Sequence, residues 1–255
     1  MSFRKAVTVL ALATLPAACG GGGSSERAAP PSTAAAAPGG PAAGATGNGN
    51  ITGKVGFQGT PPAPEKVKVA ADPKCQSMHP QGLEKQPVQV KDGGLAHVFV
   101  WVKNAPAGSA PPTEPAVLDQ KGCEYHPHIV AVRTGQPITI RNDDDTLHNV
   151  HPRPTINQEF NIGQPRKGME SVKTFDKQEI MIPVGCDVHP WMRSYISVVS
   201  HPFFAVTRDD GTYEIKGLPA GEYEVEAYHE KLKTQTQKVT VKDGDNKLDF
   251  SYQGS

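Results

Sequence analysis

The sequence EIMIPVGCDVHPWMRSYISVVS, residues 179–200, contains two strand-like runs joined by a short loop. The runs EIMIPV and SYISVVS are rich in β-branched and aromatic side chains, which favour strands. The loop between them, CDVHPWM, places Cys186, His189 and Met192 three residues apart. The stretch therefore predicts two strands whose connection carries a thiol, an imidazole and a thioether.

Similar runs recur through the 255-residue chain from Ile51 to Tyr252, and no sustained helical period occurs. In YEVEAY, for example, Tyr223, Val225 and Ala227 fall on one face of a strand and glutamates on the other. The 26 glycines and 24 prolines punctuate short elements. The sequence therefore predicts an all-β fold. The expected strands lie within 50–57, 96–102, 128–142, 179–184, 194–200, 211–218, 221–229 and 236–244.

The side chains of the loop, together with an upstream histidine, have the chemistry of a copper site. Thiolate, imidazole and thioether are ligands that a soft copper ion prefers. A strand-like run, GQPITIRN, leads through a polar loop to His148, which supplies a second imidazole. Zinc remains an alternative, although structural zinc sites favour two or more cysteines and do not recruit methionine. A trinuclear copper centre is disfavoured because only His126 and His128 form an H-x-H pair.

These motifs carry a resemblance to a known family. GQPITIRN, followed by His-Asn-Val (148–150) and Cys-x-x-His-x-x-Met, resembles the cupredoxins, the blue-copper electron carriers, over about residues 123–200. The loop is most similar to the amicyanin type within this plastocyanin-like group. The resemblance implies a Greek-key β-sandwich with one mononuclear type 1 copper ion. Its implied ligands are His148, Cys186, His189 and Met192.

The same resemblance implies supporting roles for residues around the ligands. Asn149 is expected to tie the two ligand-bearing segments together, with its backbone N–H directed at the Cys186 sulfur. His189 is expected to reach the surface inside an apolar patch, the electron exit of the family. Pro190, Trp191 and Pro152 are expected to furnish that patch. The acidic run NDDDT, before His148, is expected to be a solvated turn.

A second resemblance covers the two ends of the folded part. Residues 204–241, FAVTRDDGTYEIKGLPAGEYEVEAYHEKLKTQTQKVTV, resemble the last half of a carboxypeptidase regulatory-like domain, a transthyretin-like β-sandwich. ITGKVGFQGTPPAP and VFVWVK fit the first half of that family. Residues 51–103 and 203–255 are therefore expected to form one discontinuous sandwich, with a copper domain at 104–202 nested between them. Two tandem modules are the alternative.

The N-terminal residues 1–19 read as a signal peptide. Arg4 and Lys5 precede a short apolar run, and the pattern resembles a bacterial lipoprotein signal in which Cys19 is lipidated. Ordinary signal cleavage is the alternative. Residues 20–50 are rich in Gly, Ala and Pro and are expected to be a disordered tether. The protein is therefore expected to be exported, to the periplasm or cell surface, on a membrane anchor.

Export also bears on the remaining cysteines. Disulfides persist outside the cytosol, so Cys75 and Cys123 are the candidate pair once Cys19 and Cys186 have other roles. The alternative is a second Cys/His metal site, because histidines lie close to both cysteines.

Together these features predict a non-enzymatic, exported type 1 copper protein that transfers single electrons. The implied partner is a redox protein such as a cytochrome or an oxidoreductase, with a membrane contact through the lipid anchor. The balance of 26 basic and 26 acidic side chains argues against nucleic acid. One alternative is a copper-binding and delivery protein with the same ligands. Another is a β-sandwich interaction module in which the metal is structural.

Overall fold

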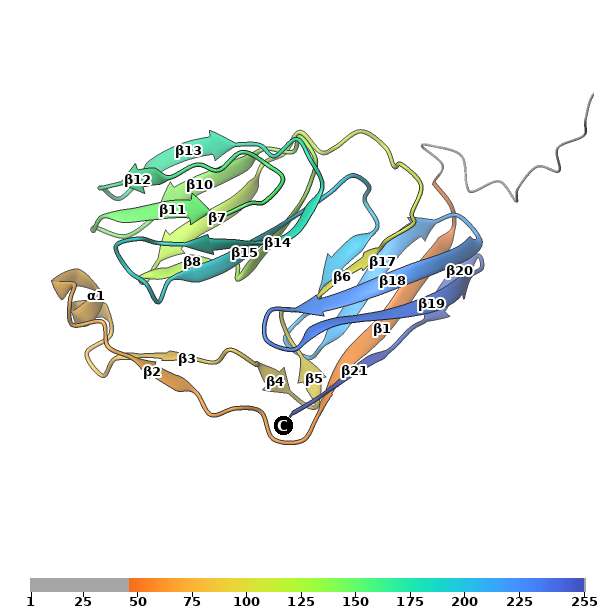
Figure 1. Cartoon of the computed structure of the whole chain (residues 1–255), viewed down its shortest axis with the longest axis horizontal. Helices are drawn as coiled ribbons and strands as arrows, with labels where there is room; N and C mark the ends of the chain where they lie inside the picture. The colour runs from red at the N-terminus through yellow and green to blue at the C-terminus, as the bar shows by residue number, and fades with distance from the viewer. Residues whose placement is uncertain (1–45, 255) are drawn as a thin grey trace, which may run out of the picture. The chain divides into compact units, whose positions relative to one another are not determined.

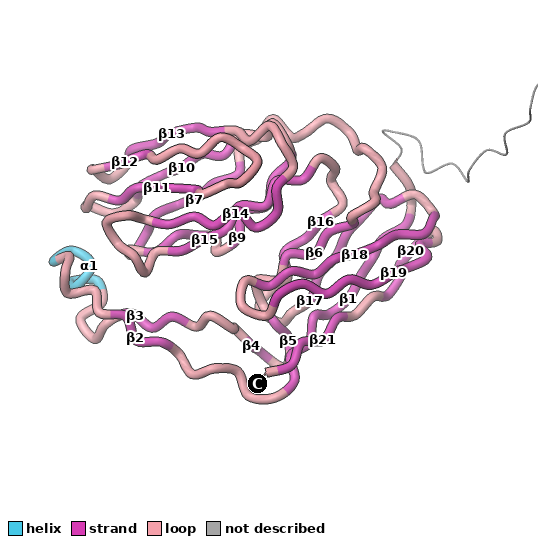
Figure 2. Tube along the Cα trace, viewed as in Figure 1, coloured by secondary structure: helices cyan, strands magenta, loops and turns pink. Residues whose placement is uncertain are grey.

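The computed structural model describes residues 46–254, and these form an almost entirely β-stranded structure (Figure 1 and Figure 2). Within them, twenty-one strands accompany a single six-residue helix, α1 (Pro73–Met78). The predicted all-β fold class is confirmed. The signal peptide, Cys19 and most of the tether lie outside the described residues. The first strand, β1 (Gly49–Gln58), includes the last two residues assigned to the tether.

No helix among the described residues has the length and apolar character needed to cross a membrane.

Strands from the two ends of the described chain form one β-sandwich, called here the split sandwich. In its first sheet β1 pairs antiparallel with β17 and parallel with β20 and β21. That sheet contains β1, β4 (Val90–Lys91), β5 (Gly94–Leu95), β17 (Thr212–Leu218), β20 (Gly244–Lys247) and β21 (Phe250–Gln253). The second sheet, in the order β16-β6-β18-β19, contains β6 (Phe99–Val102), β16 (Phe204–Val206), β18 (Gly221–His229) and β19 (Lys233–Val241).

Alternating side chains build the core of the split sandwich. In β18, Tyr223, Val225 and Ala227 are buried, while the three glutamates that alternate with them are not. Ile51 of β1 and Val102 of β6 belong to the same hydrophobic cluster. The segments before and after the middle of the chain therefore share one core, because neither can cover its own apolar face alone.

The residues between β6 and β16 form a second sandwich, the central sandwich. One sheet, in the order β13-β10-β7-β8, contains β7 (Ala116–Lys121), β8 (Glu124–His126), β10 (Ile138–Asn142) and β13 (Met169–Lys173). The other, in the order β12-β11-β14-β15-β9, contains β9 (Ile129–Arg133), β11 (His148–Pro152), β12 (Ile162–Gln164), β14 (Glu179–Gly185) and β15 (Arg193–Val199). Both sheets contribute to one core, which includes Ile140, Ile182 and Ile196.

One segment of the first half departs from the expected domain boundary. Residues 65–85, called here the cover segment, form the small antiparallel hairpin of β2 (Glu65–Val67) and β3 (Leu83–Lys85) with α1 between the two strands. A disulfide joins Cys75 of α1 to Cys123 of the central sandwich. The cover segment therefore packs on the central sandwich, although the sequence predicts that it belongs to the first half of the split sandwich.

Candidate metal centre

The loop between β14 and β15 is closed by its own backbone. The two strands pair up to Gly185 and Arg193, so that residues 186–192 form the connection. Within it, the backbone N–H of Met192 donates to the carbonyl of His189 (2.9 Å), and the N–H of Cys186 donates to that of Met192 (3.4 Å). This compact turn buries Cys186, His189 and Met192.

The strand β11 brings the second imidazole to this loop. It pairs antiparallel with β14, and its first residue, His148, extends past the paired positions. The Nδ1 atoms of His148 and His189 are 2.9 Å apart, and Nδ1 of His189 is 3.8 Å from Sγ of Cys186. One ligand atom from each of these three buried residues lies within 4.8 Å of the others. Met192 belongs to the same buried cluster as Cys186.

The surroundings of Cys186 favour its thiolate. Burial opposes ionisation, but hydrogen-bond contacts with the rings of His148 and His189 and with two backbone N–H groups outweigh it and lower the thiol pKa to about 6. The thiolate is the form of cysteine that binds metals. The loop therefore presents this sulfur in its ligand state near neutral pH.

Asn149 connects the β11 segment to the loop. Its backbone N–H points at Sγ of Cys186 (3.5 Å), and its side-chain Oδ1 accepts from the backbone N–H of Asp187 (2.7 Å). Its Nδ2 donates to Asn161 (2.7 Å). These bonds fix the loop against the strand that carries His148.

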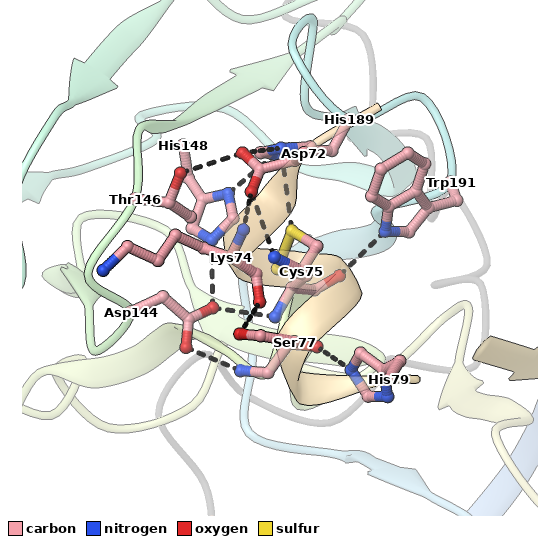
Figure 3. Close-up of a disulfide and its surroundings, with 12 residues drawn as sticks. Asp72, Lys74, Cys75, Ser77, His79, Asp144, Thr146, His148, His189 and Trp191 are labelled. Carbon is pink, nitrogen blue, oxygen red and sulfur yellow. Dashed lines mark hydrogen bonds and ion pairs between the residues drawn. A yellow bond between two sulfur atoms is a disulfide. The ribbon is translucent and has the colours of Figure 1, made fainter. Parts of the chain in front are cut away.

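Each histidine is also held by a carboxylate through its other ring nitrogen (Figure 3). Nε2 of His148 lies 2.9 Å from Oδ2 of Asp144. Nε2 of His189 lies 3.1 Å from Oδ2 of Asp72, the N-cap of α1. A carboxylate that accepts from the outer nitrogen fixes the orientation and tautomer of a metal-binding imidazole.

The pKa shifts of these groups have the same origin. Burial opposes ionisation of Asp72, but hydrogen bonds from the Cys75 backbone, Thr146 and His189 lower its pKa to about 2. Burial likewise opposes ionisation of Asp144, yet its bonds to His148 and to backbone N–H groups lower its pKa. For His148, burial would lower the pKa, but the bond to Asp144 helps to raise it.

The expected surface exposure of His189 is wrong. Only 1% of His189 is exposed, because the cover segment lies over its outer edge, with Sγ of Cys75 3.7 Å from Nε2. Trp191 packs on the imidazole with ring centroids 5.0 Å apart and donates to the carbonyl of Cys123. Pro190 is exposed, whereas Pro152 is buried. The predicted exit patch is therefore absent from this edge, which a distant segment of the chain covers.

The interpretation of NDDDT as a solvated turn is also wrong for its central aspartate. Asp144 is buried with 5% exposure and bonds to His148, while Asp145 is exposed. Sequence reasoning missed Asp72 altogether. The pair Asp72-Pro73 is a helix-start signal, which would have located α1 but not its contact with His189.

The remaining histidines do not join the cluster. His128 pairs with Glu230 (2.8 Å), and His79 and His126 bond to backbone carbonyls. Cys75 and Cys123 are disulfide-bonded. The second Cys/His metal site, which needed free thiols, is therefore not formed.

Comparisons with known proteins give matches among solved structures. No protein-family model and no curated protein matches the chain. A copper-containing nitrite reductase from Thermus scotoductus is 19% identical with a TM-score of 0.30, over 37% of this chain and 24% of that one. The chain thus spans about a quarter of that reductase. A mutant of amicyanin in the Cu(I) form is 20% identical with a TM-score of 0.30, over 39% and 97%. A purple cupredoxin from Nitrosopumilus maritimus is 20% identical with a TM-score of 0.29, over 32% and 98%.

Proposed function

We propose that this protein binds one copper ion in a mononuclear type 1 site and carries single electrons between redox partners. The supporting observation is the convergence of Nδ1 of His148, Nδ1 of His189 and Sγ of Cys186 on one buried point. With Met192 as a weak thioether ligand, they make the donor set of a blue-copper site. Cys186 is the only free cysteine among the described residues, and one cysteine suits a type 1 copper site better than a structural zinc site.

The contacts around the two histidines support a cation between them. Asp144 and Asp72 are acceptors, so each imidazole donates its Nε2 proton outward and leaves a lone pair on Nδ1. Two such lone pairs facing each other at 2.9 Å repel unless a proton or a metal ion lies between them. A bound copper ion would supply one-electron redox chemistry there.

The chain's own residues would keep that chemistry reversible. The loop and β11 hold the donors in a fixed frame, and the Asn149 N–H directed at the sulfur stabilises the thiolate. Burial of all three donors excludes water. These features suit a carrier, in which the ligands move little when the electron arrives.

The setting of this role is part of the proposal. A lipoprotein-like signal at Cys19 and a Gly/Ala/Pro tether support a location of the folded part outside the cytosol, at the periplasmic or cell-surface side of a membrane. There the partner would be a redox protein, such as a cytochrome or an oxidoreductase. The protein would make and break no bonds of its own.

The test is a visible absorption spectrum of the purified protein with one equivalent of Cu(II), before and after ascorbate. An intense thiolate-to-copper band that bleaches on reduction and returns in air is expected. The variant Cys186→Ser should bind copper without that band. A faint band in the wild-type protein, or none, would refute the type 1 assignment.

A competing Cu(I) chelator then separates carriage from delivery. Because the site is closed over His189, the reduced protein should keep its copper over many turnovers. Rapid loss of the metal to the chelator would instead favour the delivery function.

A further inference from the structure

We propose that Asp72 and Asp144 are a pair of positioning residues, which orient the two ligand imidazoles and stabilise the oxidised over the reduced metal. The inference rests on the proposed copper site but concerns residues that lie outside its ligand set. One carboxylate comes from the cover segment and the other from the turn before β11.

Both contacts are close and shielded from solvent. Oδ2 of Asp144 lies 2.9 Å from Nε2 of His148, and the two side chains are 4% and 0% exposed. Oδ2 of Asp72 lies 3.1 Å from Nε2 of His189, with exposures of 17% and 2%. Charges in such surroundings are screened far less than charges on the surface. Each carboxylate therefore acts on its imidazole with less solvent screening than a surface carboxylate would.

The carboxylates are themselves fixed through the same disulfide. Oδ1 of Asp72 accepts from the backbone N–H of Cys75 (3.0 Å) and of the residue before it (2.7 Å). Asp144 accepts from the backbone N–H of Cys123 (2.7 Å) and of the residue before it (2.8 Å). Each aspartate thus accepts from the backbone of one half-cystine and of the residue before it. The Cys75–Cys123 disulfide joins the two half-cystines. One covalent link thus joins the two backbone segments that hold the carboxylates.

The two carboxylates determine which ring nitrogen faces the metal position and which oxidation state of the metal is favoured. An ionised carboxylate only accepts, so it selects the Nε2–H tautomer and turns the Nδ1 lone pair toward the metal position. Two negative charges behind the imidazoles also favour the more highly charged metal ion. Cu(II) is therefore stabilised relative to Cu(I), and the reduction potential is lowered.

A purely structural role is the competing explanation, because Asp72 caps α1. Asparagine is as good an N-cap as aspartate, so Asp72→Asn keeps the helix start while removing the charge. Asp145→Asn is the matched control. Asp145 lies beside Asp144, pairs with Lys74 of α1 at 2.8 Å and is 77% exposed, and no contact joins it to either ligand histidine.

The experiment measures reduction potential and Cu(II) affinity for the wild-type protein, Asp72→Asn, Asp144→Asn and Asp145→Asn. Loss of such a partner weakens metal binding by about 10- to 100-fold. Each tenfold loss that falls on Cu(II) alone raises the potential by about 59 mV. We expect the first two variants to keep the thiolate band at a higher potential, and Asp145→Asn to match the wild type.

Two results would overturn the inference. One is a wild-type thiolate band together with unchanged potentials in Asp72→Asn and Asp144→Asn. The other comes from nitrogen NMR of the metal-free wild-type protein, which does not depend on any variant folding: both histidines should carry a proton at Nε2, and its absence from either would contradict the proposal. Absence of a wild-type thiolate band would count against the copper site itself, not against the carboxylate contacts.

Discussion

Replacing both Cys75 and Cys123 by alanine should lower the free energy of unfolding and release the cover segment. The disulfide spans a sequence separation of 48 residues. For a loop of that length, the loss of chain entropy in the unfolded state corresponds to about 4 kcal/mol at 25 °C. Both half-cystines are completely buried, so the lost packing adds to this figure.

Apart from the disulfide, the cover segment is held by noncovalent contacts, which include Asp72 with Thr146, His79 with the Gly122 carbonyl and Lys85 with Glu124. A helix of six residues is too short to be stable alone, and β2 and β3 have three residues each. The exposed pair of Lys74 and Asp145 contributes at most about 1 kcal/mol. Without the disulfide, the bond between Asp72 and His189 competes directly with water. We therefore expect the cover segment to open before the central sandwich unfolds.

Tryptophan fluorescence can follow both events. Trp191 packs against a cluster that includes Val69, Cys75 and Leu83 of the cover segment, so it reports on that segment. The other tryptophan, Trp101, lies in the split sandwich and is replaced by phenylalanine in both proteins as a common background. Urea titrations of the metal-free proteins then give the difference in unfolding free energy.

The expected result is a red shift of Trp191 emission in the variant at urea concentrations that leave the strands intact by circular dichroism. A single transition with the wild-type midpoint would refute the reasoning. It would mean that the cover segment is held by its noncovalent contacts and that the disulfide contributes little.

Three further perturbations test other parts of the structure. Burial opposes ionisation of Glu179, but backbone and side-chain donors from Thr155 and Asn157 lower its pKa from 4.5 to about 2. Its stabilisation is therefore complete above pH 4.5 and is lost as the pH falls toward 2; Glu179→Gln should remove up to about 3 kcal/mol at pH 7 and flatten the acid side of a pH series of urea titrations. Tyr125→Phe leaves the Asn149 carbonyl without its buried hydroxyl donor and should cost about 1–3 kcal/mol in the same assay. Gly53→Ala would place a Cβ 1.8 Å from a backbone oxygen in the split sandwich; the thermal midpoint should fall while the copper spectrum stays unchanged.

The local parts of the candidate site could be predicted from the sequence. Cys186, His189 and Met192 lie within seven residues, so their spacing alone brings them to one turn. The strand leading toward His148 was visible from its apolar alternation and the polar loop after it. Strand alternation also gave the buried face of β18, because side chains on a strand repeat every second residue.

The parts that were missed depend on contacts between distant residues. Asp72 and His189 are separated by 117 positions, and no periodicity in the sequence links them. A rule based on sequence pattern cannot distinguish the three aspartates in the turn NDDDT. Only the tertiary structure distinguishes them, because Asp144 alone meets the N–H groups beside Cys123 and the imidazole of His148.

The cover segment over the proposed copper site helps to distinguish electron transfer from copper delivery. A protein that delivers copper must let an incoming ligand reach the ion, and here the cover segment lies over the outer edge of the buried His189. Such a ligand would have to displace Asp72 together with a cover segment that a disulfide holds in place. An electron needs no opening, because it can pass through packed atoms such as the Trp191 ring against His189. The variant in which both Cys75 and Cys123 are alanine tests this closure. It should lose copper to a chelator faster than the wild-type protein does. It should still exchange electrons, since the ligands of the proposed site are all intact.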